Sequence, residues 1–413
     1  MELKPGYKQT EVGVIPDEWE VKPIKEFAAV KGGKRLPLGE SLVDKETSHP
    51  YVRVTDMRPG GVLLSDIKYV PEDVFPTIKS YRISSKDIFI SVAGTLGIVG
   101  KVPAELDGAN LTENADKITN IDCDQDFLLH NLLSERIQAI IESERTVGVQ
   151  PKLALGRIEN FKIALPPTLP EQRAIAGTLA DVDALLGALT QLIAKKRDLK
   201  QAAMQQLLTG QTRLPGFSGK WEVKQLGDVA EIVSGGTPRT GVASYWDGGI
   251  RWCTPTDITG TAGKYLSETA RTISQAGLDS CSAQLLPAGA LLLCSRATIG
   301  ELKIAVRDVC TNQGFKSLIA KEGVSNEYLY YLLLTMKPQL VGRAIGSTFL
   351  EISKKDTASL DVSLPLFDEQ SAIAAVLSDM DAELTALEQR LAKTRALKQG
   401  MMQELLTGRT RLV

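Results

Sequence analysis

The chain has 413 residues, of which 43% are hydrophobic and 24% are charged, and this composition excludes extensive intrinsic disorder. A net charge of −2 and an isoelectric point near 6.0 exclude a protein that is basic throughout, so any nucleic-acid contact must come from local basic clusters. Five cysteines without a CxxC pair, together with two histidines, argue against a disulfide framework or a structural zinc site and indicate a reducing cytoplasm. We expect no signal segment and no membrane span, because no apolar run approaches about 20 residues.

The first 165 residues form a mixed segment of short apolar runs between turns. A strand-like phrase opens at Trp19, and a glycine-rich turn follows at residues 32–35. Residues 51–56 form a second strand-like phrase. Residues 88–97 read as a buried strand that enters a turn, and a shorter helix opens at Phe127. The segment is predicted to be α+β.

A long helix is predicted next, from Pro170 to Leu208. Thr168 and Glu171 have capping-box spacing before it, and Gly210 suits the left-handed residue that ends a helix. Its apolar residues alternate in steps of four and three, which is the seam of a coiled coil. The seam consists of Ile175, Leu179, Val182, Leu186, Leu189 and Ile193.

The same order of elements then repeats. Residues 213–363 form a second mixed segment, with weaker counterparts of the first at residues 221–224, 235–239, 250–257 and 291–300. In this alignment Gly32 and Gly33 match Gly235 and Gly236.

A second long helix, from Asp368 to Leu406, closes the repeat and agrees with the first helix at most positions. Asp368 is its predicted N-cap, and Gly408 follows its end. Each helix would be about 58 Å long and would bury its seam against the other. The second seam consists of Ile373, Leu377, Met380, Leu384, Leu387 and Leu391.

The predicted fold class is therefore α+β, with an antiparallel coiled coil and a circular, pseudo-twofold internal repeat. The chain after the first helix continues into Pro215-Gly216-Phe217, whereas the N-terminus supplies the matching Pro5-Gly6-Tyr7. The predicted boundaries are residues 1–165 and 213–363 for the two mixed domains. Residues 166–212 and 364–413 form the two spacer helices.

The sequence contains no complete catalytic motif among those considered. Gly94 to Lys101 superficially suggests a phosphate-binding loop, but Thr95 and Val102 occupy positions that the motif reserves for Gly and Ser/Thr. Leu165-Pro166-Pro167 lacks the amide or acid and the aromatic residue of an amino-methyltransferase tetrapeptide. The sequence contains no G-x-S-x-G or H-E-x-x-H motif. We therefore predict a chain without catalytic or metal-binding residues.

This arrangement resembles the specificity subunit of type I restriction-modification systems. The resemblance covers essentially the whole chain and includes residues 13–21, the Gly-Gly-Thr-Pro of residues 235–238, and Asn312-Gln313. It also includes a Leu-Pro before each long helix and a Glu-Gln in the first turn of that helix. The first half departs from this pattern, because Gly-Gly-Lys-Arg and Glu113-Asn114 stand where the family has Gly-Gly-Thr-Pro and Asn-Gln.

The resemblance implies that each mixed segment is a target recognition domain reading one half of a bipartite sequence in double-stranded DNA. It implies a cytoplasmic subunit that spaces these domains with its helices and docks methylation subunits, two of them, and a restriction subunit. S-adenosylmethionine, ATP and Mg²⁺ would be bound by those partners, with no cofactor on this chain and no contact with a membrane.

DNA recognition needs cations that grip phosphate and side chains that reach base edges. The glycines of residues 32–33 and 235–236 would either bring the backbone close to DNA or form a hairpin turn. Asp56 and Asp257 would either accept from a cytosine amino group or stabilise a turn. Lysines and arginines on the exposed helix faces, at residues 195–200 and 393–398, would meet a partner or the DNA backbone. The candidate DNA-binding residues are Lys34, Arg35, Arg53, Arg58, Arg239, Arg251, Arg296, Lys316 and Arg343.

Two other functions remain open at this point. A self-sufficient DNA methyltransferase or nuclease would show activity as a purified chain. A protein scaffold without a DNA role would show no preference for any DNA sequence.

Overall fold

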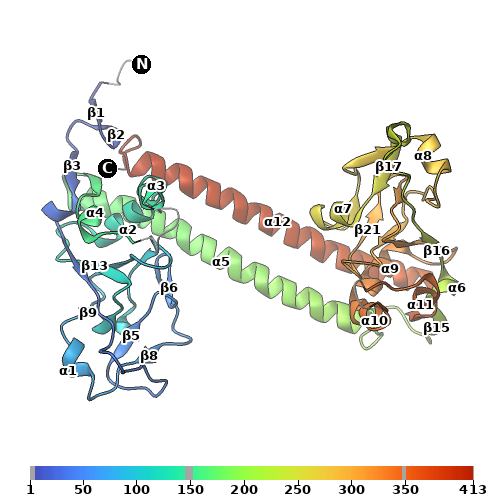
Figure 1. Cartoon of the computed structure of the whole chain (residues 1–413), viewed down its shortest axis with the longest axis horizontal. Helices are drawn as coiled ribbons and strands as arrows, with labels where there is room; N and C mark the ends of the chain where they lie inside the picture. Colours follow the sequence, from blue (N-terminus) through green and yellow to red (C-terminus); the bar gives the residue numbers. More distant parts are fainter. Residues whose placement is uncertain (1–4, 145–151, 347–349, 413) are drawn as a thin grey trace. The chain divides into compact units, whose positions relative to one another are not determined.

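The structure is a computed structural model that describes residues 5–144, 152–346 and 350–412 (Figure 1). It divides into two compact units. The first unit is Met1–Ala188 with Leu391–Val413, and the second is Leu189–Arg390. Each unit therefore contains one mixed segment and parts of both long helices, so the helices do not form a body separate from the domains. The two units are described one at a time.

The first unit has two four-stranded sheets and several two-stranded ribbons. One sheet has the order β11-β10-β13-β4 and the other β8-β5-β12-β9. A ribbon of β3 and β14 marks where the mixed segment begins and ends. The strands are β1 (Tyr7–Thr10), β2 (Gly13–Pro16), β3 (Glu20–Pro23), β4 (Ala29–Gly32), β5 (Pro50–Val52), β6 (Met57–Arg58), β7 (Gly61–Val62), β8 (Lys68–Tyr69), β9 (Arg82–Ile83), β10 (Ile88–Ser91), β11 (Val99–Gly100), β12 (Ala109–Leu111), β13 (Ala115–Thr119) and β14 (Lys162–Leu165).

Short helices pack on these sheets. Asp124 and Ser134 begin α2 and α3 by accepting from the third amide of each helix. The largest core of the unit joins α2 to the first sheet and to the ends of both long helices, through Phe127, Leu179 and Leu406 among others. The short helices are α1 (Phe75–Ile78), α2 (Gln125–Leu133), α3 (Glu135–Ser143) and α4 (Leu155–Glu159), with 3-10 turns at Ile24–Glu26 and Ala104–Leu106.

The second unit repeats this plan with longer strands. A five-stranded sheet has the order β16-β23-β20-β21-β18, and a three-stranded sheet has the order β19-β17-β22. A ribbon of β15 and β24 again marks the ends of the mixed segment. The strands are β15 (Glu222–Gln225), β16 (Ala230–Ser234), β17 (Trp246–Cys253), β18 (Tyr265–Leu266), β19 (Arg271–Ile273), β20 (Leu291–Leu293), β21 (Leu302–Ala305), β22 (Cys310–Thr311), β23 (Lys316–Ala320) and β24 (Asp361–Leu364).

The core of the second unit centres on α9, whose Tyr328 and Tyr331 are fully buried. These side chains belong to one apolar cluster with Leu208 and Leu377, so parts of both long helices are built into the domain. The short helices are α6 (Leu226–Val229), α7 (Pro255–Gly260), α8 (Gln275–Asp279), α9 (Asn326–Thr335), α10 (Lys337–Gly342) and α11 (Lys354–Ala358), with a 3-10 turn at Ala243–Tyr245.

The two long helices are α5 (Leu169–Leu207) and α12 (Phe367–Leu405), of 39 residues each. Each begins and ends one residue earlier than predicted. Thr168 caps α5 as predicted, since its hydroxyl accepts from the amide of Glu171. Asp368 lies in the first turn of α12 and not at its N-cap. In the first turn its carboxylate suits the positive end of the helix dipole. Gly210 and Gly408 have φ of +71° and +67°, as helix-ending glycines require.

The helices run antiparallel within each unit. In the first unit Lys398 contacts Asp183 at 2.6 Å, and in the second unit Lys200 contacts Asp381. Since α5 and α12 agree in sequence, these two ion pairs are the same pair formed twice.

A second repeated ion pair closes the ends of the helices. Arg411 bonds to Glu171 in the first unit, and Arg213 bonds to Glu369 in the second, with one contact of 2.6 Å. Both glutamates have side chains that are 2% exposed. Because a buried carboxylate is costly without a cation, these pairs hold the chain that follows each helix against the start of the other helix.

All twelve predicted seam residues are buried or half-buried. Leu179 and Leu377 are completely buried, whereas Leu186 and Leu387 are intermediate. The seam is therefore covered along its length, most completely at Leu179 and Leu377. Several predicted helix-face cations are already paired, since Lys196 contacts Glu383 at 2.7 Å, in addition to the pairs described above.

The helix α5 is long and apolar enough to cross a membrane by length and composition alone. This test allows charged residues within the stretch, so it does not contradict the expectation that no uninterrupted apolar run approaches about 20 residues. One such helix is weak evidence of membrane insertion, since a helix that packs in a protein core passes the same test. Ile175 and Leu179 of α5 are in such a core.

Candidate nucleic-acid interface

A glycine loop in each unit carries predicted basic residues. Gly33 follows β4, and Gly235 follows β16. A side-chain carbon at either position would lie 2.0 Å from a backbone carbonyl oxygen, that of Thr112 or that of Asn312. This distance is far inside van der Waals contact, so only glycine fits. The two glycines therefore serve the packing of backbone on backbone within the protein.

Backbone hydrogen bonds fix the alignment of the two loops. The amide of Lys34 donates to the carbonyl of Leu111 at 2.8 Å, as the amide of Gly236 donates to Thr311 at 2.9 Å. Lys34 is therefore the counterpart of Gly236. The predicted alignment of these loops is wrong by one residue, because matching the letters Gly-Gly does not identify which glycine meets the neighbouring strand.

In each unit an aromatic side chain donates a hydrogen bond to a carbonyl of the glycine loop. The hydroxyl of Tyr51, on β5, donates to the carbonyl of Lys34 at 2.8 Å. The indole of Trp252, on β17, donates to the carbonyl of Gly236 at 3.0 Å. Both aromatic residues are buried, and burial raises the pKa of Tyr51 to about 12. The loops are therefore held in place by the same contact in both units.

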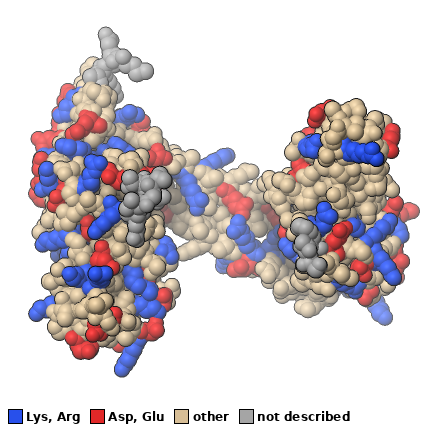
Figure 2. Space-filling model, viewed as in Figure 1, with Lys and Arg blue, Asp and Glu red and all other residues tan. Residues whose placement is uncertain are grey.

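The basic side chains next to these loops are exposed. Lys34 and Arg35 follow Gly33, and Arg239 follows Gly236 after two residues. The Lys34 ammonium lies 5.7 Å from the centre of the Tyr81 ring. In the ranges that the structure describes, none of these three cations has an ion pair closer than 4.0 Å. They are the predicted residues best suited to meet phosphate. On the face seen in Figure 2, basic and acidic side chains are interspersed over both units, as the net charge of −2 implies.

Two other predicted arginines are neutralised within the chain. Arg53 bonds to Asp56 at 2.7 and 3.0 Å and to Asp66 at 3.1 Å. These hydrogen bonds, with that to Asp56 the largest cause, raise the pKa of Arg53. Arg251 bonds to Glu268 at 3.1 Å and lowers the pKa of that carboxyl. Both arginines have side chains that are only about a quarter exposed, at 25% and 23%. Their first role is to join neighbouring loops.

Asp56 and Asp257 stabilise turns. Asp56 accepts from the amide of Arg53 at 2.8 Å. Asp257 accepts from the amides of Thr254 and Ala270 at 2.7 and 2.8 Å. Of the two roles considered for these carboxylates, the local one accounts for their contacts.

Lys316 is not a surface cation, which corrects its prediction as a DNA-binding residue. Its side chain is 8% exposed, and its ammonium lies 3.1 Å from Glu351. It also donates to the hydroxyl of Ser295 at 3.4 Å. Arg296 shares Glu351 at 4.0 Å and is 41% exposed. Lys316 sits on β23, and burial of that strand places its side chain inside the domain.

The first unit has the opposite charges at the same place. Asp116 occupies the position of Lys316 on the equivalent strand, as the register of β13 on β4 and of β23 on β16 shows. Lys152 and Glu351 occupy equivalent isolated bridges. Burial raises the pKa of Asp116 to about 6, against a lowering by the charge of Lys152. Asp116 and Lys316 are therefore both buried side chains, whereas Lys152 is exposed and Glu351 is 38% exposed.

The remaining predicted cations are exposed and donate to nearby backbone or hydroxyl groups. Arg58 donates to the carbonyls of Met57 and Thr55 at 2.6 and 3.0 Å. Arg343 donates to the hydroxyl of Ser359 at 2.7 Å. Neither lies on a glycine loop.

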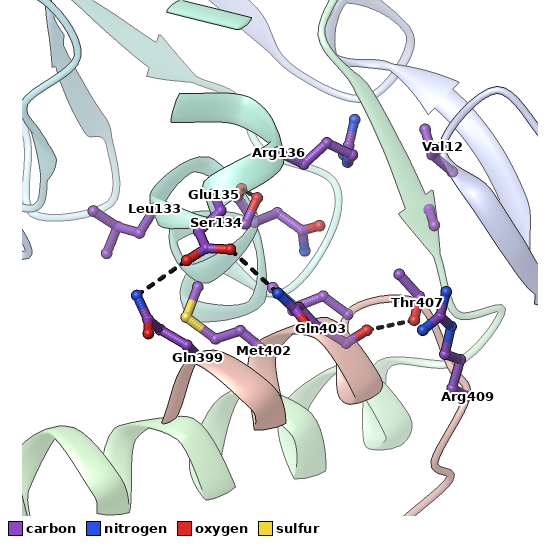
Figure 3. A pocket seen from close by; sticks show the side chains of 13 residues that line it. Val12, Leu133, Ser134, Glu135, Arg136, Gln399, Met402, Gln403, Thr407 and Arg409 are labelled. Carbon is purple, nitrogen blue, oxygen red and sulfur yellow. Dashed lines mark hydrogen bonds between the residues drawn. The ribbon is translucent and has the colours of Figure 1, made fainter. Parts of the chain in front are cut away.

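A cavity of about 430 Å³ lies elsewhere in the first unit, where α2 and α3 meet the end of α12 (Figure 3). Its carboxylate, Glu135, accepts from Gln399 at 3.0 Å and from Gln403 at 3.2 Å. Arg136 donates to the carbonyl of Lys162 at 2.7 Å, and desolvation lowers its pKa. The polar groups of this cavity bind one another and attach α12 to the domain.

An aromatic site that was not predicted from the sequence lies next to the second glycine loop. Trp246 and Trp252, two of the four tryptophans of the chain, lie at the two ends of β17 with ring centres 5.0 Å apart. Arg271 of β19 stacks on Trp246. The signal available was the concentration of tryptophan next to a glycine-rich turn.

The five cysteines are free. Within residues 5–144, 152–346 and 350–412, no group of three or more histidine, cysteine, aspartate or glutamate side chains is placed to hold a metal ion.

Comparison with known families now defines the class of protein. A sequence model described as "Type I restriction modification DNA specificity domain" matches residues 16–197 and matches again at residues 218–395. These matches cover most of the chain and follow its internal repeat. The chain therefore belongs to this family, and the predicted resemblance is confirmed.

Individual relatives agree. The MjaIX specificity subunit of Methanocaldococcus jannaschii is 40% identical over 163 residues, which are 39% of this chain and 38% of that relative. The putative MjaX specificity subunit of the same organism is 25% identical over 98% of this chain and 97% of its own length. The chain thus spans the whole of one relative and about two fifths of the other.

Solved structures share the fold. The type I S subunit from M. genitalium has a TM-score of 0.59 at 15% identity, covering 98% of both chains. A chain from a study of complex assembly and conformational transition of the type I R-M system also has a TM-score of 0.59, at 20% identity, covering 95% of this chain and 99% of that one. These likenesses support the predicted fold class.

Proposed function

We propose that this chain is the DNA-recognition subunit of a type I restriction-modification complex and reads a bipartite target, one half-site per unit. The observation that carries the proposal is the repeated glycine loop. Its framework of Gly33 or Gly235 with Tyr51 or Trp252 is the same in both units. The exposed cations beside it differ. A shared framework with different side chains suits two domains that read different sequences.

The chain is proposed to be non-catalytic and to act in the cytoplasm. Methylation subunits, two of them, and a restriction subunit would dock on it. They would bring S-adenosylmethionine, ATP and Mg²⁺, while this chain would bind no cofactor. The family and the missing catalytic motifs support this division of labour. The long helices, with cations such as Lys195 and Arg395 on exposed faces, offer surface for docking.

A domain exchange tests the proposal. Residues 24–161 lie between the two strands of the β3–β14 ribbon, so they can be replaced by the matching segment of a relative without cutting a sheet. Sequencing of methylated DNA should then show one half-site changed and the other retained. The matched control exchanges residues 226–360, between β15 and β24, and should change the other half-site.

Three outcomes would contradict the proposal. A change in both half-sites, or in neither, would exclude independent reading by the two units. Specific methylation by the partner subunits without this chain would exclude its role as the recognition subunit. Methyl transfer or cleavage by the purified chain alone would exclude a non-catalytic subunit.

A further inference from the structure

Arg271 is stacked on a tryptophan at the surface of the second unit. Its guanidinium carbon lies 3.6 Å from the centre of the Trp246 ring and 5.8 Å from that of Trp252. Both tryptophans are buried, at 7% and 5% exposure, whereas Arg271 is exposed. At 3.6 Å the planar cation lies against the face of the indole. The cation therefore has a buried aromatic ring on one side, while the residue as a whole remains exposed.

A bulge in β17 aims Trp246 at this arginine. The register of β17 against β19 shifts between Trp246 and Ile250, both of which pair with Ile273. Within the bulge Asp247 has a φ of +59°. A side-chain carbon at Gly248 would lie 2.4 Å from the Cα of Ser274, the residue after β19. Bulges redirect side chains and gather near functional sites. The backbone therefore adopts an uncommon conformation at the point that positions the Trp246 ring under Arg271.

The charge of Arg271 is available for a ligand. Its neighbour Arg251 is paired with Glu268, but Arg271 has no ion pair within the described parts of the chain. The register of the first unit places Lys68 at the equivalent position, opposite Tyr51, as Arg271 is opposite Trp252. Lys68 contacts two carboxylates, Asp44 and Asp66. The equivalent position therefore differs between the units, because Lys68 is neutralised by two carboxylates and Arg271 is exposed.

Hydrogen bonds join the rings of Trp246 and Trp252 to the second glycine loop. The indole of Trp246 donates to the carbonyl of Arg239 at 3.3 Å, and that of Trp252 donates to Gly236 at 3.0 Å. Arg271 therefore sits on the same pair of rings that fixes the loop carrying Arg239. Two exposed arginines on one rigid surface are suited to a polyanion.

We propose that Arg271 is a DNA-contact residue of the second recognition domain, held by Trp246 so that its guanidinium donates two parallel hydrogen bonds. This inference rests on the proposed function and identifies a residue that carries it out. The acceptors are a pair of oxygens on a DNA phosphate or the O6 and N7 atoms of a guanine, since both present two acceptors to a planar guanidinium. Lys68 is not expected to make the equivalent contact in the first unit.

The test uses the full chain assembled with its methylation subunits, and Arg271→Ala, Arg271→Lys and the matched control Lys68→Ala. Binding is titrated on the DNA site recognised by the unchanged complex, at several salt concentrations. Arg271→Ala should weaken binding by about tenfold or more. If the acceptors are phosphate oxygens, it should also reduce the slope of log K against log salt by about 0.9. Arg271→Lys should keep the slope but not the full affinity, because an ammonium cannot donate in a planar pair. Lys68→Ala should leave both unchanged.

The source of the acceptors follows from the methylated sequences. Loss of discrimination at one base of the second half-site indicates a guanine edge, whereas equal weakening on all sequences indicates a phosphate. Both support the inference. It is overturned if Arg271→Ala, with unchanged thermal unfolding, retains the affinity, salt slope and target sequence of the unchanged complex. It is also overturned if Lys68→Ala reproduces the loss. Failure of the proposed function would look different, because the unchanged complex would then bind DNA without sequence preference.

Discussion

Replacing Gly235 by alanine tests whether the glycine loop is fixed by backbone packing. The new carbon would lie 2.0 Å from the carbonyl oxygen of Asn312, whereas ordinary contact begins at 3.4 Å. The loop would have to move by more than 1 Å. Overpacking of this kind costs about 1–3 kcal/mol. The movement would also strain the Gly236–Thr311 and Trp252–Gly236 hydrogen bonds, each worth about 1 kcal/mol.

The expected loss of stability of the second unit is therefore about 3–5 kcal/mol, which lowers its melting temperature by about 10 °C for a unit of this size. Circular dichroism during heating measures it. Gly241→Ala is the control in the same loop, because a carbon there meets no atom within 4 Å, and it should shift the midpoint by about 1–2 °C at most. Equal midpoints for the two variants would refute the packing argument. At a temperature where the Gly235 variant is folded, only the second half-site should be read poorly.

Three further substitutions test the packing, titration and ion pairs. Leu377→Ala removes three carbons from a fully buried side chain and should lower the free energy of unfolding by about 2–5 kcal/mol. Val376→Ala, at a neighbouring residue that is 36% exposed, should lower it much less, and thermal unfolding of the two variants compares them. Because the pKa of Asp116 is raised to about 6, the folded state binds the proton more readily than the unfolded state does. The stability, measured as the melting temperature, should therefore fall as the pH rises from about 4 to 6. Asp116→Asn should remove that fall. Arg213→Met strands a carboxylate that is 2% exposed, so urea unfolding should show a larger loss than for Arg197→Met, whose partner is 46% exposed.

The helices were predictable from the sequence because their signals are local. Heptad spacing, the Thr168 cap and the positive-φ glycines at residues 210 and 408 act within a few residues of one another, and the predicted ends are within one residue of those found. The ion pairs between helices were not predicted. Lys200 and Asp381 are distant in sequence, so no local pattern distinguishes them from solvated surface charges.

The recognition surface was predicted less well for the same reason. Whether an arginine is available for DNA depends on the acids that the fold brings beside it, as with Arg251 and Glu268. Burial of Lys316 depends on the pairing of its strand with β16. The bulge that aims Trp246 at Arg271 requires a register shift between two strands, which the sequence of either strand alone does not specify.

The division between framework and readout explains how one chain can present two different surfaces. The contacts that fix each glycine loop use backbone carbonyls and amides, as when Gly33 meets Thr112 and Gly235 meets Asn312. Side chains on neighbouring positions are then free to change without moving the loop. Lys68 and Arg271 occupy one such position, the first neutralised by carboxylates and the second presented on an aromatic ring. Two domains built in this way share their fold while presenting different charges, so the two half-sites of the target need not resemble each other.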